Sequence, residues 1–369
     1  MGLQEYRCPC CGGSIEFNSN IGKMKCPFCD TEFEMESLKD LDQALDKEEP
    51  ESMTWNSYEG QSWSGEDMTG MAAYHCKSCG AEIVTAETTG ASACPFCGNP
   101  IVMMNNFAGN LKPDFIIPFK LDKNAAKEAL TKHFQGKKLL PSAFSSQNHI
   151  DEVTGVYVPF WLFNSGADAD IRYKCTKVRR WSDNDYNYKE TKYYTVLRSG
   201  SLAFENIPVD ASKKMADDLM DSLEPFKFDE KKEFMTAYLS GYLADKYDVS
   251  ADESVERANV RIKNSTIQQF RSTVKDYDTV ETENSTIRLR DGSYKYVLLP
   301  MWILYTSWNG QKFVFGMNGQ TGKFVGDLPM DKGKFWKYFL LYFVISAIIV
   351  FIIAFFLFKN QFFMKKLKI

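Results

Sequence analysis

A repeated cysteine pattern near the N-terminus constrains the fold of this 369-residue chain more than any other feature. The spacing C-x2-C-x14-C-x2-C occurs twice, and Tyr6 and Tyr74 precede the two copies at matching positions. One module is therefore repeated without a gap in the alignment. The cysteines are Cys8, Cys11, Cys26 and Cys29 in the first copy and Cys76, Cys79, Cys94 and Cys97 in the second.

This spacing is typical of a zinc ribbon. A CxxC turn places two thiolates on one side of a tight knuckle, and two facing knuckles complete a tetrahedron with Zn–S distances of about 2.3 Å. Gly12, Gly80 and Gly98 follow the knuckles and allow φ above zero. Four thiolates leave no open coordination position, so we expect two structural zinc ions per chain. A thioredoxin-like redox role is the alternative, but no βαβ pattern surrounds these pairs.

The remaining cysteines and histidines do not form a catalytic signature. Cys10 could replace a neighbouring ligand, although a free thiol is favoured, and Cys175 is expected to be a small buried hydrophobe in a strand. His75 stands beside a site that is already full, while His133 and His149 have no nearby Ser, Cys or carboxylate partner in sequence. We therefore expect no enzymatic activity.

An acidic segment separates the two ribbons, which are assigned to residues 1–36 and 71–104. Residues 30–70 hold thirteen acidic residues against two lysines, a net charge of −11. We interpret 37–70 as a solvated acidic linker. Trp55, Tyr58 and Trp63 within it are either idle or used by a partner, and the idle interpretation is favoured.

Residues 112–330 have the composition of a globular domain. A strand is expected over 115–121, followed by a helix over 125–134 with Asp122 as its N-cap and Gly136 at its end. Strands are expected over 153–178 and 193–204, separated by the polar run 181–190.

The second half of this domain returns to helices and then to strands. Helices are expected over 211–223, 230–246 and 251–274, and strands over 286–325. Turn signals occur at Asp291-Gly292, Asn309-Gly310 and Asn318-Gly319. The segments 158–162 and 299–303 echo each other, which suggests two related half-domains. The predicted fold class is α+β: two N-terminal zinc ribbons, a mixed domain with antiparallel strands, and one C-terminal transmembrane helix.

The run from Asn318 to Lys323, NGQTGK, superficially resembles a phosphate-binding loop. It fails the pattern because Met317 stands where the first glycine is required and Phe324 stands where a Ser or Thr must meet magnesium. Its flanks also read as strands, so a β-hairpin turn is the better interpretation.

Residues 338–358 form a stretch of 21 residues without a charge, Gly or Pro. At a rise of ~1.5 Å per residue the stretch reaches about 31 Å, which matches a hydrocarbon core of roughly 30 Å. Phe335 and Trp336 lie at one end, as an interfacial aromatic belt would. A fully buried core helix is the alternative, but such helices rarely run this long without a polar face.

Lysines flank the span on both sides, so the positive-inside rule does not orient it. No N-terminal signal is visible, and reduced thiolates suit the cytosol. We therefore expect a single-pass protein of the cell membrane whose bulk is cytoplasmic, with the basic tail 359–369 crossing. The alternative, should the lysines of the tail resist crossing, is that the span lies in the membrane as a re-entrant or interfacial hairpin.

The charge balance disfavours nucleic acid as a ligand. The formal charge is −4 with a pI near 5.6, and acidic residues outnumber basic ones in both ribbons. Lys174, Lys177, Arg179 and Arg180, next to Trp181, form the one notable basic cluster. This cluster could contact RNA or anionic lipid, but a solvated hairpin flank is the default interpretation.

Seven segments are distinctive in combination: the knuckles YRCPCCGG, CPFCD, YHCKSCGAEI and CPFCGNPIV, and the segments LKPDFIIPFK, VYVPFWLF and MNGQTGKFVGDLP. Together they resemble the bacterial YdjG-like family, membrane-anchored proteins with twin zinc ribbons of the transcription-factor-IIB type. The chain departs from the pattern at Cys10 and at Asp30, which stands where a glycine is expected. Such proteins are often labelled by analogy with a primosomal helicase, but this sequence lacks the nucleotide site that the label requires.

The resemblance implies association with membrane-stress proteins of the phage-shock type and with a flotillin-like (SPFH) partner. We therefore expect a non-enzymatic, membrane-anchored adaptor that binds a protein partner. The alternative is a membrane-tethered nucleic-acid-binding protein.

Overall fold

The computed structural model describes residues 8, 13–39, 53, 55–58, 60–104, 111–145 and 152–366. The chain divides into two compact units. The first, here called the hairpin unit, comprises Met1–Gln61, Phe160–Ala211 and Val249–Val297. The second, the anchor unit, comprises Ser62–Pro159, Ser212–Asp248 and Leu298–Ile369. Of the two echoing segments, 158–162 spans a boundary between the units and 299–303 lies within the anchor unit, just after another boundary.

A small antiparallel sheet forms the first ribbon in the hairpin unit. Its strands follow the order β1 (Glu16–Asn18), β2 (Lys23–Lys25) and β3 (Glu32–Phe33). Ile15, Met24 and Leu38 pack with Cys8 and Cys26 to make its core. The core is small, as is typical of modules that a bound metal ion stabilises.

Two long antiparallel strands, β8 (Thr154–Ser182) and β9 (Asn187–Asp210), dominate the hairpin unit. Their pairing runs from Phe160 opposite Asp210 to Ser182 opposite Asn187, with a register shift between Phe163 and Ser165. The turn closes on the Asp183 carboxylate, whose Oδ1 accepts N–H bonds from Asp185 at 3.0 Å and Tyr186 at 2.7 Å. The predicted strands are confirmed, but the polar run 181–190 is mostly strand as well.

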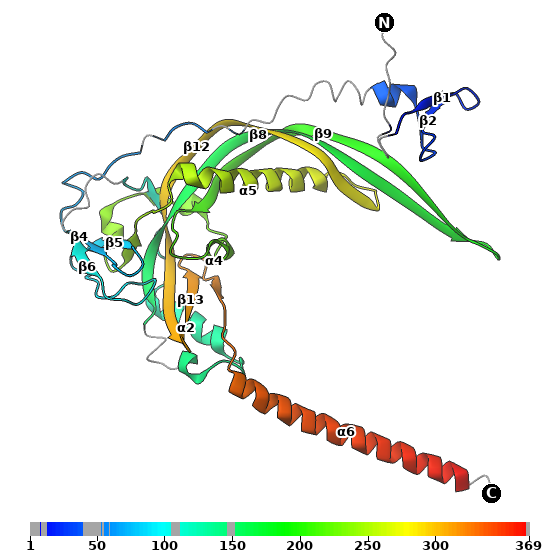
Figure 1. Ribbon diagram of the computed structural model, residues 1–369. Coiled ribbons are helices and arrows are strands. Elements are labelled where there is room, and N and C mark those ends of the chain that lie inside the picture. Colours follow the sequence, from blue (N-terminus) through cyan, green and yellow to red (C-terminus); the bar gives the residue numbers. More distant parts are fainter. Residues whose placement is uncertain are drawn as a thin grey trace. The chain divides into compact units, whose positions relative to one another are not determined.

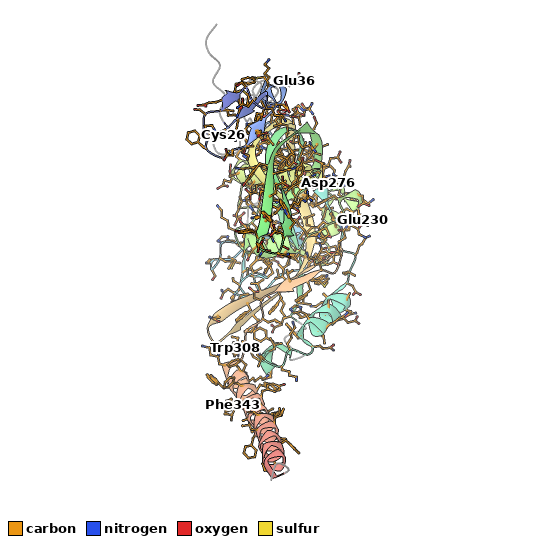
Figure 2. All side chains as sticks on the ribbon, turned by 90° about the vertical axis from the view of Figure 1, so that its right-hand side faces the viewer. Cys26, Glu36, Glu230, Asp276, Trp308 and Phe343 are labelled. Atoms are coloured by element: carbon orange, nitrogen blue, oxygen red, sulfur yellow. The ribbon has the colours of Figure 1, made fainter. Side chains whose placement is uncertain are left out.

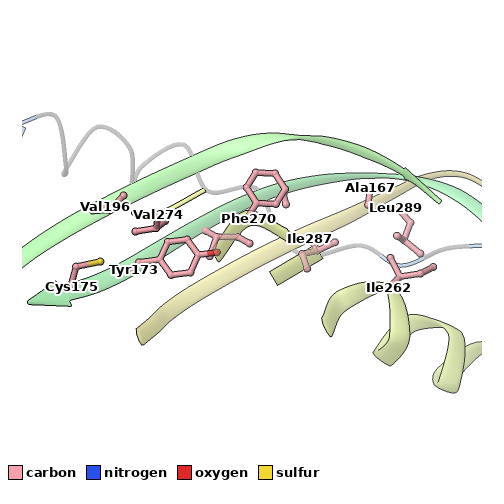
Figure 3. Close-up of a cluster of buried hydrophobic side chains, with 11 residues drawn as sticks. Ala167, Tyr173, Cys175, Val196, Ile262, Phe270, Val274, Ile287 and Leu289 are labelled. Carbon is pink, nitrogen blue, oxygen red and sulfur yellow. The ribbon is translucent and has the colours of Figure 1, made fainter. Parts of the chain in front are cut away.

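The helix α5 (Ala251–Ser272) lies along one side of these strands and β12 (Thr279–Trp308), as Figure 1 shows. A capping box of Ser250 and Glu253 begins it, so the helix predicted over 251–274 is confirmed. Ile262 and Phe270 face a buried cluster with residues such as Tyr173 (Figure 3). Cys175 belongs to this cluster and is fully buried, as predicted.

The anchor unit is built on a larger, mostly antiparallel sheet. Strands pair in the order β10-β7-β12-β8-β11-β5-β4-β6, while β13 pairs with β12 and β14 with β13. The pair of β11 and β8 is parallel. The strands not yet bounded are β4 (Met71–His75), β5 (Glu82–Ala86), β6 (Val102–Met104), β7 (Phe115–Ile116), β10 (Lys232–Glu233), β11 (Leu243–Asp245), β13 (Gln311–Asn318) and β14 (Phe324–Gly326).

A helical layer covers part of this sheet. The helix α2 (Lys123–Phe134) begins at Asp122, whose carboxylate accepts the N–H of Ala125, which confirms the predicted cap. The 3-10 helix η1 (Ser142–Ser145) follows it. Leu130, Phe134 and Phe144 pack against Trp302 and Phe315 of the sheet.

Two sequence-based helix predictions need correction. Only α4 (Asp217–Ser222) forms within 211–223, and 230–246 contains no α-helix. Instead, η2 (Phe228–Glu230), β10, η3 (Thr236–Leu239) and β11 follow one another. Gly241 has φ of 84°, which ends any helix, and the buried strand β11 pairs with both β5 and β8. Strand pairing of β11 on both sides therefore outweighs the helix propensity of the residues around it.

The strand and turn predictions were partly correct. Asn309-Gly310 joins β12 to β13 with φ of 50° and 76°, as a tight hairpin requires. Asp291-Gly292 does not end a strand, because β12 continues through it while Asp291 absorbs a φ of 54°. The strand predicted over 115–121 is limited to β7.

The aromatic residues of the predicted acidic linker belong to the fold. Trp55 Nε1 donates to Asn259 Oδ1 at 2.8 Å, and Tyr58 contacts Trp161 with ring centroids 5.9 Å apart. In the anchor unit, Trp63 is 7% exposed and donates to the Leu111 carbonyl at 3.1 Å. The idle, solvated interpretation is wrong for these three side chains; residues 40–52 of the linker lie outside the described part.

Candidate metal centres

Each cysteine knuckle is closed by the same backbone hydrogen bond. The N–H of the first cysteine donates to the carbonyl five residues later, at distances of 2.7 to 2.9 Å. The four pairs are Cys8 with Gly13, Cys26 with Thr31, Cys76 with Ala81 and Cys94 with Asn99. This shared geometry brings the two sulfurs of a knuckle to the same side of the turn.

The residue after the second cysteine turns the chain back with φ in the left-handed region. Gly80 and Gly98 have φ of 76° and 71°, and Asp30 has φ of 56° at the equivalent position. The N–H of Asp30 donates to the Cys26 carbonyl at 2.9 Å. The N–H groups of Gly80 and Gly98 donate in the same way to the carbonyls of Cys76 and Cys94. Asp is among the few non-glycine residues that tolerate this conformation. The departure at Asp30 therefore leaves the knuckle intact.

The second ribbon brings four sulfurs together. Cys76, Cys79, Cys94 and Cys97 offer Sγ atoms that all lie within 4.8 Å of one another. Cys76 Sγ is 3.6 Å from Cys97 Sγ, and Cys79 Sγ is 3.6 Å from Cys94 Sγ. These distances are far too long for a disulfide. They match the roughly 3.8 Å edge of a tetrahedron whose metal–sulfur bonds are about 2.3 Å.

The first ribbon shows three of its four predicted ligands in the same arrangement. Cys8, Cys26 and Cys29 lie within the same 4.8 Å limit, and Cys8 Sγ is 3.6 Å from Cys29 Sγ. Cys11, like Cys10, lies outside the described residues. The seven described cysteines thus form two clusters, as the spacing predicts, and each cluster could hold a metal ion.

Burial and nearby N–H groups act in opposite directions on these thiols. Burial raises the pKa of Cys79 to about 11 and also raises that of Cys94. Burial opposes ionisation of Cys97 too, but the backbone and side-chain N–H groups of Asn99 outweigh it and lower its pKa to about 7. A bound cation reverses the cost of burial, because a coordinated thiol is deprotonated outright. The donor set thus suits a metal ion.

The two centres are supported differently. Strand β5 of the second ribbon pairs with β11, at Val84 opposite Ala244 and at Ile83 opposite Asp245. Lys246 Nζ also contacts Glu82 Oε2 at 2.8 Å. In contrast, β1, β2 and β3 of the first ribbon form their own three-stranded sheet (Cys26 is labelled in Figure 2). The sequence repeat did not reveal this difference.

The NGQTGK segment is confirmed as a hairpin turn between β13 and β14. Its side chains hold a neighbouring loop: Asn318 Nδ2 donates to the Leu223 carbonyl at 3.0 Å. Gln320 accepts the N–H of Lys227 at 2.8 Å and donates to its carbonyl at 3.0 Å. Asn318 and Gln320 therefore form hydrogen bonds that hold a neighbouring loop, which is a structural role and not phosphate binding.

The C-terminal helix α6 spans Lys332–Lys366. Its segment Lys332–Phe356 is long and apolar enough to cross a membrane, with a mean hydropathy of 3.0 and none of the apolar window buried against the protein. Figure 2 shows side chains projecting freely around Phe343. The alternative of a buried core helix is therefore wrong.

Comparisons with known proteins place the chain in a family. No protein-family model matches it, and neither does any solved structure. Over 334 residues it is 35% identical to the uncharacterized protein YdjG of Bacillus subtilis (strain 168), which covers 90% of this chain and 92% of the relative. The chain belongs to the YdjG family.

Apart from the two cysteine clusters, this YdjG-family chain has a basic and aromatic surface at the far end of the β8–β9 hairpin. Residues 171–198 contain eight basic and three acidic residues. Figure 1 shows this end projecting beyond α5 and β12. Its large exposed side chains are Trp181, Tyr186, Tyr188, Tyr193, Tyr194 and Leu197. The sequence cluster at 174–181 indicated part of this surface, but not the tyrosines of β9 that register places beside it.

Two of the histidines, His75 and His133, lie in the described part of the chain. His133 packs on Phe324 with ring centroids 4.4 Å apart, and burial lowers its pKa. His75 ends β4 and does not belong to the sulfur cluster.

Proposed function

We propose that this YdjG-family protein is a non-enzymatic, membrane-anchored adaptor that binds a protein partner through the far end of its β8–β9 hairpin. The observation that carries the proposal is the group of exposed aromatic side chains on that hairpin. Trp181 is 45% exposed, Tyr188 39% and Tyr193 46%. Aromatic residues and Arg are the side chains most enriched at protein interfaces, and clusters of them on a soluble surface mark docking sites.

Zinc is the ion we assign to both ribbons. Four thiolates in a tetrahedron are typical of structural zinc, and they leave no position for a substrate or an activated water. The ribbons therefore supply stability rather than chemistry. Elemental analysis of the reduced protein, purified without chelator, is expected to give two zinc ions per chain; one or fewer would contradict the assignment.

The membrane part of the proposal rests on α6. We propose a single-pass anchor with the folded units in the cytoplasm, where thiolates stay reduced. Tethering raises the local concentration of any partner in the same membrane, so a modest interface suffices. A membrane-stress partner of the phage-shock or SPFH type fits this arrangement and remains part of the proposal by resemblance.

Nucleic acid is the second candidate ligand, because the same hairpin surface is basic. Its aromatic faces, however, already have partners: Trp181 and Tyr188 stack at 5.4 Å, and Arg179 lies 5.3 Å from the Trp181 ring. Lys177 lies 5.8 Å from the Tyr194 ring. Stacking of unpaired bases needs free aromatic faces. These contacts favour a protein partner.

The test uses the full-length protein in detergent micelles or nanodiscs. Affinity capture from solubilised membranes should recover a partner with the wild type, and the double variant Trp181→Ala/Tyr188→Ala should lose it. Val260→Ala, at an exposed position of α5, is the matched control. In parallel, labelled single-stranded and duplex oligonucleotides are titrated at physiological salt. Binding tighter than about 1 µM, beyond the usual non-specific range, would favour the nucleic-acid function instead.

A further inference from the structure

An apolar groove runs along one face of α6 near its start. Its floor and walls are side chains of the helix, and its closed end is the loop after α2, where Lys138 and Leu139 lie. The cavity has a volume of about 600 Å³. All of these residues belong to the anchor unit.

The loop is fixed to the helix by two hydrogen bonds. The N–H of Asp331 donates to the Leu139 carbonyl at 2.8 Å, and Lys334 Nζ donates to the Leu140 carbonyl at 2.6 Å. Leu140 is buried in the core of the anchor unit. These hydrogen bonds hold the loop in place at the end of the groove.

Two rows of aromatic rings line the groove on the helix. Phe335, Phe339 and Phe343 form one row, with successive centroids 6.2 and 6.3 Å apart. Tyr338 and Tyr342 form the neighbouring row, 6.5 Å apart. Residues four apart lie above one another on a helix, so the rows run parallel to its axis. The space beside these rows is lined almost entirely by apolar side chains.

Positive charge gathers where the groove ends. Lys138 Nζ lies 6.0 Å from the Tyr338 ring centroid and is exposed. Residues 136–140 and 331–337 together contain five lysines and one acidic residue, Asp331. The Asp331 carboxylate accepts the N–H of Lys334 at 3.1 Å and so caps the helix. The rim is thus strongly cationic above an apolar trough.

We propose that this groove binds one anionic phospholipid, with its phosphate beside Lys138 and an acyl chain between the two aromatic rows. The inference rests on the proposed membrane anchoring by α6. A second membrane helix could cover the rings, but it would not need a cationic rim. Lysines next to a membrane span attract acidic headgroups of the cytoplasmic leaflet, and Tyr and Trp favour the headgroup level.

The groove also gives α6 a defined depth. With the phosphate at Lys138, the loop after α2 lies at the membrane surface, and Phe339 and Phe343 lie among the acyl chains. The anchor unit would then be held against the anionic leaflet rather than suspended from a free tether.

Native mass spectrometry of the full-length protein tests the site. The protein is reconstituted into nanodiscs of equimolar phosphatidylglycerol and phosphatidylcholine, released into detergent, and its retained lipid is counted. We expect about fivefold enrichment of phosphatidylglycerol in the wild type, since one lysine near a surface favours an acidic lipid by about that factor. Lys138→Gln should remove most of the enrichment. Lys132→Gln, an exposed lysine of α2 that does not line the groove, should retain it.

Three outcomes would overturn the site. Equal retention of both lipids by the wild type would mean that there is no headgroup selectivity. Unchanged enrichment in Lys138→Gln would place any selectivity elsewhere. Displacement of the lipid by millimolar inorganic phosphate would mean that the anion alone is the ligand. Failure of the protein to enter the bilayer is a separate result, which would refute the membrane anchor itself as well as the lipid site.

Discussion

Val84 of the second ribbon lies opposite Ala244 of β11, so the strand that leads from one cysteine knuckle to the next is part of the sheet of the anchor unit. Ile83 and Val84 on this strand are buried. Structural zinc contributes on the order of 10 kcal/mol to a small ribbon. Loss of metal from the second ribbon should therefore destabilise the anchor unit as well as the ribbon itself.

Cys79→Ser and Cys29→Ser test this asymmetry, because each replaces an exposed ligand. Cys79→Ser should lower the main thermal unfolding midpoint by about 5 °C or more and speed hydrogen exchange in β11. Cys29→Ser should release zinc from the first ribbon and leave that midpoint nearly unchanged. Equal shifts in the two variants would mean that the ribbons are equally coupled to the core.

Two knuckle glycines form a second matched pair. Gly80 and Gly98 have similar positive φ, but an added Cβ at Gly80 meets open space while one at Gly98 lies 3.1 Å from Tyr305. Gly80→Ala should cost about 1 kcal/mol in free energy of unfolding, from backbone strain alone. Gly98→Ala should cost more, since Tyr305 must also move. Urea unfolding of both variants in the presence of zinc measures the difference, and an equal loss would contradict it.

A buried ion pair predicts a pH dependence. Lys214 Nζ lies 3.1 Å from Asp245 Oδ1, and Ser212 Oγ donates to Asp245 Oδ2 at 3.0 Å. Burial raises the pKa of Asp245 to about 7 in spite of Lys214. Lys214→Met leaves this carboxylate without its cation and should cost about 3 to 5 kcal/mol near neutral pH.

The sign of the pH effect follows from the raised pKa. Lys214 lowers the pKa of Asp245, so this pKa is higher still in Lys214→Met. The native variant therefore keeps a proton that the unfolded chain releases near pH 4, and its stability falls as pH rises from about 4 through 7 and beyond. The variant should therefore be less destabilised at pH 5.5 than at pH 8. Lys214→Met/Asp245→Leu should lose this dependence and regain part of the stability. Urea unfolding at both pH values measures the loss of unfolding free energy in Lys214→Met. A larger loss at pH 5.5 than at pH 8 would contradict the raised pKa of Asp245.

Removal of residues 332–369 tests the anchor. Since α6 is the one membrane-length apolar helix in the described part of the chain, the truncated protein should move from the membrane pellet to the soluble fraction. The measurement is fractionation after a high-salt wash. Continued sedimentation of the truncated chain with membranes would show that another segment or a partner holds it there.

Local signals in the sequence predicted local structure well. The cysteine spacing predicted the grouping of the seven described cysteines. Asp122, the stretch after Ser250 and Asn309-Gly310 marked elements that the structure confirms. Each of these depends on residues within one or two turns of the chain.

Long-range pairing could not be derived in the same way. Residues 230–246 have helical composition, yet Leu243 and Ala244 pair with strands that are distant in sequence. Trp63 looked solvent-exposed among acidic residues because its partner, Phe234, is far along the chain. The cross-strand contacts that group Tyr188 with Trp181 depend on a register that composition does not specify.

The most direct test of the adaptor function is site-specific photo-crosslinking at the hairpin in intact cells. A photoreactive phenylalanine analogue replaces Tyr188 in the full-length protein, and the same analogue at Val260 is the control. We expect a discrete adduct from position 188 that survives nuclease and is absent from position 260. A nuclease-sensitive adduct at position 188, or equal adducts at both positions, would contradict it.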